Sequence, residues 1–371
     1  MSKKIAAGAS AAALAAGIAA PALAETVYDN GSGGTVSLYG QFNPTFQSFD
    51  DGTGRYDSLA DNANANSRVG MDVTQSYGAG TFRFKFETGL GLRSSDGISQ
   101  SGKPAEMSWD RTDIRHVDFA YQSAGFGTFS AGQGSMASDG AAGADLSGTG
   151  VVQSAWISDT AGAFEFRDSS GGLTGVAIED AFAVYDGSRL GRVRYDSIDL
   201  NGFTFSASYG EEVLDSSADF SMYDVTARYS NENAGAFAVS AALGYGWEDD
   251  GGARSEAVNG SVSVLHKDTG LSFTAAAGDR DTAGTYGYAK LGYTTDLIAA
   301  GATAFGVDYY NGDDTATAGS EARSWGFAAV QSFDSANIDA HLGYREYSYA
   351  DGSATSYQDS ASILAGASLK F

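Results

Sequence analysis

The chain has 371 residues, 50 of them glycine and none cysteine, and a formal net charge of −24. These numbers exclude a disulfide-stabilised scaffold and a thiolate zinc site, and the negative charge argues against a nucleic-acid-binding protein, which needs a basic surface. Glycine costs about 1 kcal/mol at each helical position, so a helix bundle is disfavoured. Because 43% of the residues are apolar, the composition indicates a folded β-protein.

The first 24 residues have the features of a secretory signal peptide. Lys3 and Lys4 give a basic start, an uncharged alanine-rich run follows, and Ala22-Leu23-Ala24 forms a small-residue cleavage motif. We expect cleavage near Ala24, which leaves residues 25–371 as a single exported domain. An exported chain without cysteine fits the envelope of a Gram-negative bacterium.

Apolar and polar residues alternate through most of the remaining chain. In Phe82–Glu87 three phenylalanines point one way and three charged side chains the other, as in a β-strand. No stretch after residue 24 approaches the ~18 apolar residues of a membrane helix. Pro44 interrupts the first predicted strand, so we expect either a bulge there or a shorter strand. The sixteen predicted strands are residues 36–48, 67–75, 81–92, 112–122, 126–134, 189–198, 203–211, 222–230, 236–247, 255–266, 271–280, 285–295, 302–311, 322–333, 337–349 and 357–371.

The connections between these strands alternate in length. Those after even-numbered strands are short, such as Ser123–Gly125 and Asn231–Gly235, whereas most of those after odd-numbered strands are longer and polar, such as Phe49–Asn66 and Ser135–Ser188. This alternation is typical of an antiparallel up-and-down β-barrel that crosses a membrane, with tight periplasmic turns and longer external loops. The sequence therefore predicts an all-β transmembrane barrel of sixteen strands.

The C-terminus carries a more specific signal. The last predicted strand places Ile363, Ala365, Ala367, Leu369 and Phe371 on one face, and the chain ends on that aromatic residue. Together with the export signal and the series of strands, this ending resembles a Gram-negative general diffusion porin of the alphaproteobacterial, Rhodobacter-like type. The resemblance implies that Phe371 and Leu369 are the signal for the barrel-assembly machinery. It also implies a homotrimer in the outer membrane, in contact with lipid and lipopolysaccharide.

The longest predicted loop, residues 135–188, is the candidate constriction. By the resemblance it is the third loop of a porin, which folds back into the lumen and narrows it. The acidic candidates on it are Asp139, Asp145, Asp159, Glu165, Asp168, Glu179, Asp180 and Asp186. The alternation places the basic candidates Arg68, Arg83, Lys85, Arg192 and Arg194 on the inward faces of strands. We expect the two sets to face each other and set up a transverse field, with charges that merely solvate the lumen as the alternative.

These features predict a water-filled channel for passive diffusion of ions and small hydrophilic solutes, with no cofactor. Sixteen strands leave room for an aqueous channel, whereas about eight are filled by side chains. A solute-specific porin and, less favoured, a structural or adhesive barrel remain as alternatives. We identify no Ser-His-Asp arrangement, so we expect no enzyme. Metal sites are not expected, although Asp249-Asp250 and Asp313-Asp314 could hold a loop-bound Ca²⁺ ion.

Overall fold

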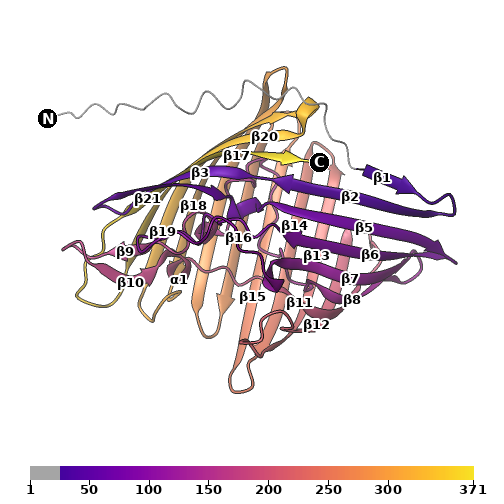
Figure 1. Ribbon diagram of the computed structural model, residues 1–371, viewed down its shortest axis with the longest axis horizontal. Coiled ribbons are helices and arrows are strands. Elements are labelled where there is room, and N and C mark those ends of the chain that lie inside the picture. The colour runs from indigo at the N-terminus through magenta and orange to yellow at the C-terminus, as the bar shows by residue number, and fades with distance from the viewer. Residues whose placement is uncertain (1–25) are drawn as a thin grey trace.

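A computed structural model describes residues 26–371, and the predicted signal peptide lies outside this range. Nineteen strands of the described chain join in one sheet, which closes into a barrel (Figure 1). None of the helices in this range is long and apolar enough to span a membrane.

The strands follow one another around the wall in chain order. They are β1 (Thr26–Asp29), β2 (Gly34–Phe42), β3 (Pro44–Asp50), β4 (Arg55–Asp61), β5 (Arg68–Tyr77), β6 (Gly80–Gly89), β7 (Ile114–Ser123), β8 (Gly127–Ser135), β11 (Arg189–Asp196), β12 (Phe203–Glu211), β13 (Ser221–Ala234), β14 (Phe237–Asp249), β15 (Arg254–His266), β16 (Leu271–Arg280), β17 (Gly284–Ile298), β18 (Gly301–Asp313), β19 (Glu321–Phe333), β20 (Ile338–Ala350) and β21 (Ser360–Lys370). A separate hairpin is formed by β9 (Glu165–Arg167) and β10 (Leu173–Ala177). The helices are η2 (Ala63–Ala65), η3 (Arg111–Asp113), η4 (Ile157–Thr160), α1 (Ile178–Ala181) and η5 (Asp334–Ala336).

The barrel has the sixteen wall strands that the sequence predicts. β2 and β3 are two halves of one wall strand, β4 and β5 are two halves of the next, and β1 is a short extra strand that pairs only with β2. The wall closes where β21 pairs antiparallel with both β2 and β3. The predicted all-β antiparallel barrel is therefore confirmed.

The first wall hairpin corrects one prediction. The long external loop expected over residues 49–66 is wrong, because β3 and β4 pair along their whole lengths around a tight turn. Both halves of this hairpin break at the level of Pro44, which cannot donate to the ladder. There the Asn43 N–H donates to the Ser67 hydroxyl, and its side-chain amide donates to the Ala65 carbonyl oxygen. The alternation does not reveal β4 because two of its three exposed residues, Arg55 and Asp57, are charged and only Leu59 is apolar.

The outer surface of the wall is apolar. The side chains of Phe119, Val193, Leu243 and Leu291 are each more than half exposed, and their neighbours along each strand point into the barrel. So large an apolar surface is not found on a water-soluble monomer, and it fits contact with lipid hydrocarbon. The alternation in the sequence thus separates a lipid-facing side from a lumen-facing side.

The connection between β8 and β11, here called the inward loop (residues 136–188), lies inside the barrel. Its first part follows the inner wall, where the Leu146 N–H donates to Ser263 of β15 and the Ser147 carbonyl oxygen accepts from Thr294 of β17. It then reaches β3, where Gln47 donates to the Thr160 carbonyl oxygen. These contacts carry the loop across the lumen face of half of the barrel.

The returning part of the inward loop contains β9, β10 and α1 and packs its aromatic rings against the wall. The ring of Phe182 lies 5.3 Å from that of Tyr310 on β18, and the ring of Phe166 lies 5.5 Å from that of Tyr349 on β20. Phe164 stacks on Phe49 of β3 with ring centres 4.0 Å apart. The loop therefore has its own apolar core, shared with inward aromatic residues of the wall.

The last residue of the chain is built into the closing seam, beside β2 (Figure 1). The N–H of Phe371 donates to the Gly40 carbonyl oxygen at 3.0 Å, and the Gly40 N–H donates back to Phe371 at 2.8 Å. A Cβ atom on Gly40 would lie 2.6 Å from the Phe371 ring, so only glycine leaves room for it. Next to this pair, Lys370 forms an ion pair with Asp339 of β20 at 2.9 Å.

Candidate functional site

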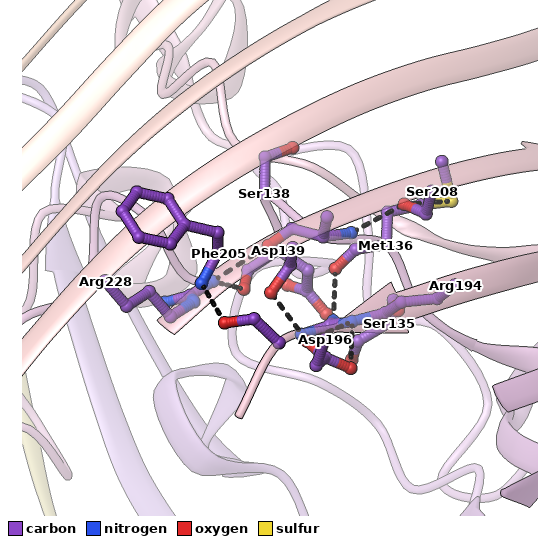
Figure 2. A network of polar contacts seen from close by, with 12 residues as sticks. Ser135, Met136, Ser138, Asp139, Arg194, Asp196, Phe205, Ser208 and Arg228 are labelled. Carbon is purple, nitrogen blue, oxygen red and sulfur yellow. Dashed lines mark hydrogen bonds and ion pairs between the residues drawn. The ribbon is translucent and has the colours of Figure 1, made fainter. Parts of the chain in front are cut away.

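Two arginines of the wall hold the start of the inward loop (Figure 2). Arg194 of β11 donates to the Met136 carbonyl oxygen at 2.8 Å, and Arg228 of β13 donates to the Asp139 carbonyl oxygen at 2.7 Å. The guanidinium of Arg194 is also paired with Asp196 at 2.7 Å. Arg194, predicted as part of a basic wall, thus positions the loop and has its charge compensated locally. Arg228 has the same positioning role and was not among the predicted residues.

Three positively charged side chains of the inner wall surround one carboxylate, that of Glu87 on β6. Arg115 of β7 donates through Nε to Oε1 of Glu87 at 2.6 Å. Nε of Arg68 and Nζ of Lys85 each lie 3.8 Å from Oε2, and the Tyr39 hydroxyl donates to the same oxygen at 2.8 Å. Because three cations share one carboxylate, this part of the wall has a net positive charge.

Alternation along the strand did not assign Arg115 to the inner face because a bulge changes the direction of its side chain. By simple alternation it falls on the same face as Val117 and Phe119, which point outward. The pairing of β6 with β7 shifts register, from Glu87 opposite His116 to the next β6 residue opposite Ile114. Arg115 is the extra residue on β7, and a bulge re-aims a side chain in this way. No signal in a single sequence would have revealed it.

Two predicted basic residues lie elsewhere and have their own partners. Arg83 lies nearer the periplasmic end of β6 and donates to Asp72 of β5 at 2.6 Å. Arg192 of β11 is buried and forms an ion pair with Asp118 of β7 at 2.6 Å. Of the five predicted basic residues, only Arg68 and Lys85 gather around one carboxylate.

The inward loop meets the basic side at Asp139. Its carboxylate lies 3.6 Å from Nη2 of Arg189, the first residue of β11. Arg189 is itself within electrostatic reach of Arg68 and Arg115. Asp186, at the other end of the loop, accepts hydrogen bonds from the N–H groups of residues 140 and 141 at 2.7 and 2.9 Å, and so ties the two ends together. Arg189 was not predicted, because it lies at the boundary between strand and loop.

Asp145 anchors the inward loop to the far wall instead of facing the opening. Its Oδ2 lies 2.7 Å from Nζ of Lys290 on β17, and the side chain of this lysine is only 1% exposed. The ammonium also donates to the Thr149 hydroxyl and to the Gln153 carbonyl oxygen, at 3.2 and 2.9 Å. All the hydrogen-bond donors of a buried cation are thus satisfied by the loop.

Two predicted acidic residues lie near a third that was not predicted. Asp159 in η4 and Glu179 in α1 are both within electrostatic reach of Asp96, which lies in the loop after β6. Burial and the charge of Asp96 raise the pKa of the Asp159 carboxyl to about 7. Burial and neighbouring Asp180 also raise the pKa of Glu179. These shifts are what crowded carboxylates with few cations nearby produce.

The remaining acidic candidates bond to their own turns. Glu165 accepts from the Gly175 N–H at 2.8 Å, and Asp168 accepts from the N–H of residue 170 at 2.8 Å, which shapes the β9–β10 hairpin. In the loops considered for Ca²⁺, Asp250 accepts from the Ala253 N–H at 2.8 Å, and Asp313 accepts from the Asn311 amide at 3.0 Å. Between residues 26 and 371 no three acidic or histidine side chains are grouped to hold a metal ion.

Comparison with known proteins identifies the class of this barrel. A family model described as Gram-negative porin matches residues 9–352, so the chain belongs to the Gram-negative porin family. It is an outer-membrane channel for passive diffusion, and porins are channels and not enzymes. A search of curated proteins finds no match.

Solved structures support the fold at low sequence identity. An anion-selective porin from Comamonas acidovorans matches with a TM-score of 0.60 and 13% identity, over 91% of this chain and 100% of that one. In-vitro folded OmpT of Vibrio cholerae, in its trimer form, matches with a TM-score of 0.55 and 15% identity, over 91% and 100%. A triple mutant of the Rhodopseudomonas blastica porin matches with a TM-score of 0.53 and 15% identity, also over 91% and 100%.

The anchor at Asp145 generates a first prediction. In Asp145→Asn, Lys290 loses its counter-ion, and breaking a buried pair costs about 3–5 kcal/mol. We expect the inward loop to leave the wall, so that single-channel current in planar bilayers becomes noisier and the mean conductance rises. Asp268→Asn, in the exposed turn after β15, is the matched control and should behave as wild type. Unchanged conductance and noise in Asp145→Asn would contradict the anchoring role.

The pKa of Asp159 generates a second prediction. A carboxyl with a pKa of about 7 is mostly neutral at pH 6 and mostly charged at pH 8. Raising the pH through this window therefore adds negative charge to the inward loop, and the reversal potential in a potassium chloride gradient should shift toward cations. Asp159→Asn should abolish the part of this shift above pH 7, because Asp186, whose pKa is raised to about 6 by burial and by Asp139, titrates lower in the window. If the variant keeps the full pH dependence, another group is titrating.

Proposed function

We propose that the channel is a general diffusion pore whose constriction lies between two charged sets. The basic wall consists of Arg68, Lys85, Arg115 and Arg189, and the acidic set consists of Asp96, Asp159, Glu179 and Asp180. The observation that carries the proposal is the sharing of Glu87 by three cations, which leaves uncompensated positive charge on the wall. Asp139, held close to Arg189, brings the loop to the edge of this wall.

Such an arrangement would act on solutes by its field. Opposed charges in a narrow aqueous passage orient dipolar solutes and favour them over apolar ones, and they offer anions and cations separate sides. Because each set has an excess of only a few charges, we infer weak overall ion selectivity despite the net charge of −24. The Comamonas relative is described as anion-selective, and the basic wall would provide the anion path here.

Neutralising each set should move the reversal potential in opposite directions. In a tenfold potassium chloride gradient, where a perfectly selective pore gives ~59 mV, we expect Arg68→Gln with Arg115→Gln to shift it by roughly 10 mV toward cations. Glu179→Gln with Asp180→Asn should shift it toward anions. Arg323→Gln, an exposed position on β19, is the control. No shift in either double variant would overturn the proposed constriction.

We further propose how the chain reaches and occupies the outer membrane. Residues 1–24 would be removed on export, which leaves residues 25–371 as the barrel domain, in contact with lipid and lipopolysaccharide. A homotrimer is supported by the relative described in a trimer form. The barrel-assembly machinery would bind the last strand through Leu369 and Phe371. We also propose that the chain has no enzymatic activity.

The role of Phe371 in assembly can be separated from its contribution to barrel stability. Phe371→Ala should lower the amount of barrel in the outer membrane of living cells several-fold, while the purified variant still folds in detergent micelles, because its backbone hydrogen bonds with Gly40 remain. Folding is measured by the gel-mobility shift on heating. Phe333→Ala, another aromatic residue near a periplasmic turn, is the control. Equal losses in cells and in micelles would assign Phe371 to barrel stability alone.

A further inference from the structure

A cavity of about 230 Å³ lies on the external side of the basic wall. It is bounded by the ends of β7, β8 and β11 and by the loop after β12. The lining residues used in the argument are Asp113, Arg115, Gln133, Arg189 and Glu212. We propose that this cavity is a binding site for small carboxylic acids that carry a hydroxyl or ammonium group next to the carboxylate. This inference rests on the proposed diffusion function and adds a solute class to it.

Two guanidinium groups of the lining provide hydrogen-bond donors for a carboxylate. Arg115 and Arg189 bring two guanidinium groups within electrostatic reach of each other, and Nε of Arg189 is buried without a hydrogen-bond partner among the described residues. The lining also contains two carboxylates, of which Glu212 accepts from the N–H groups of residues 214 and 215. Asp113 accepts from the Asp110 N–H at 2.9 Å. Guanidinium groups with free donors match the geometry of a carboxylate.

Gln133 favours a hydrogen-bond donor on the same ligand. Its side chain is only 7% exposed, and its amide nitrogen donates to the Arg189 carbonyl oxygen at 3.1 Å. Its Oε1 is buried and accepts no hydrogen bond within residues 26–371. Buried acceptors are nearly always paired, so this oxygen is suited to a hydroxyl or an ammonium group. Because Gln133 holds the backbone of Arg189, the acceptor and the guanidinium belong to one site.

The size of the cavity accommodates a small acid. A volume of about 230 Å³ equals the share of about seven or eight liquid water molecules. A three- or four-carbon acid fits, together with one or two waters. α-Hydroxy acids and α-amino acids place a donor on the carbon next to the carboxylate, as the arrangement of Arg189 and Gln133 requires. Lactate is the simplest probe with this pattern, and propionate is the same acid without the hydroxyl.

The experiment compares these two probes on the full-length channel in planar bilayers. Potassium chloride carries the current, and sodium lactate or sodium propionate is added on the external side. We expect lactate to inhibit the chloride current at a concentration about three- to tenfold lower than propionate, as one additional hydrogen bond gives. Gln133→Leu should bring lactate to the level of propionate, and Arg189→Gln should weaken inhibition by both acids. Gln122→Leu, an exposed position at the other end of β7, is the matched control and should retain the difference.

The possible outcomes separate this inference from the proposed function. Equal inhibition of the wild-type channel by lactate and propionate overturns the binding site, even if Gln133→Leu fails to insert into the bilayer. A lactate preference that survives in Gln133→Leu also overturns it. An absence of any potassium chloride current from the wild type would instead overturn the diffusion function. A preference for lactate that is lost in Gln133→Leu and kept in Gln122→Leu supports the site.

Discussion

The closed ladder of antiparallel hydrogen bonds is the constraint on which the rest of this structure depends. In hydrocarbon an unpaired backbone N–H or C=O group costs several kcal/mol, so a sheet can cross a membrane only if it has no edge. Here β21 closes the ladder against β2 and β3, down to the reciprocal pair of Gly40 and Phe371. Because the closed wall is apolar outside, every charged group that serves transport must lie on the inside or in the loops.

Inside the wall, the inward loop occupies part of a wide lumen. It is held at its start by Arg194 and Arg228, on the far side by Lys290 and Asp145, and in its returning part by aromatic packing. Many charges in the lumen are paired at short distance, either with the loop, as at Lys290, or between wall strands, as at Arg192. The smaller number left with incomplete partners, around Glu87 on one side and Asp96 on the other, is therefore what solutes would encounter.

Much of the fold could be predicted from the sequence, and less of the site. Alternation located the sixteen wall strands, but it missed β4, whose outward face is mostly charged, and it missed the turns within the inward loop. For the site, alternation assigned Arg68 and Lys85 to the inside, where both lie near Glu87. It failed at Arg115, since one extra residue in a strand reverses every side after it. It also gave no sign that Arg192 and Asp145 have buried partners.

The sequence by itself determined the barrel, its strand number and the identity of its inward and outward faces, because a lipid boundary imposes a strict period of two on each strand. The net charge of −24 excluded some partners, but it contained no information about the opening. Only the tertiary structure decided which charges remain uncompensated, because ion pairing depends on contacts between strands and loop residues far apart in the chain. The distances around Glu87, Asp145 and Asp139 follow from the register of the wall and the path of the inward loop, which local patterns do not encode.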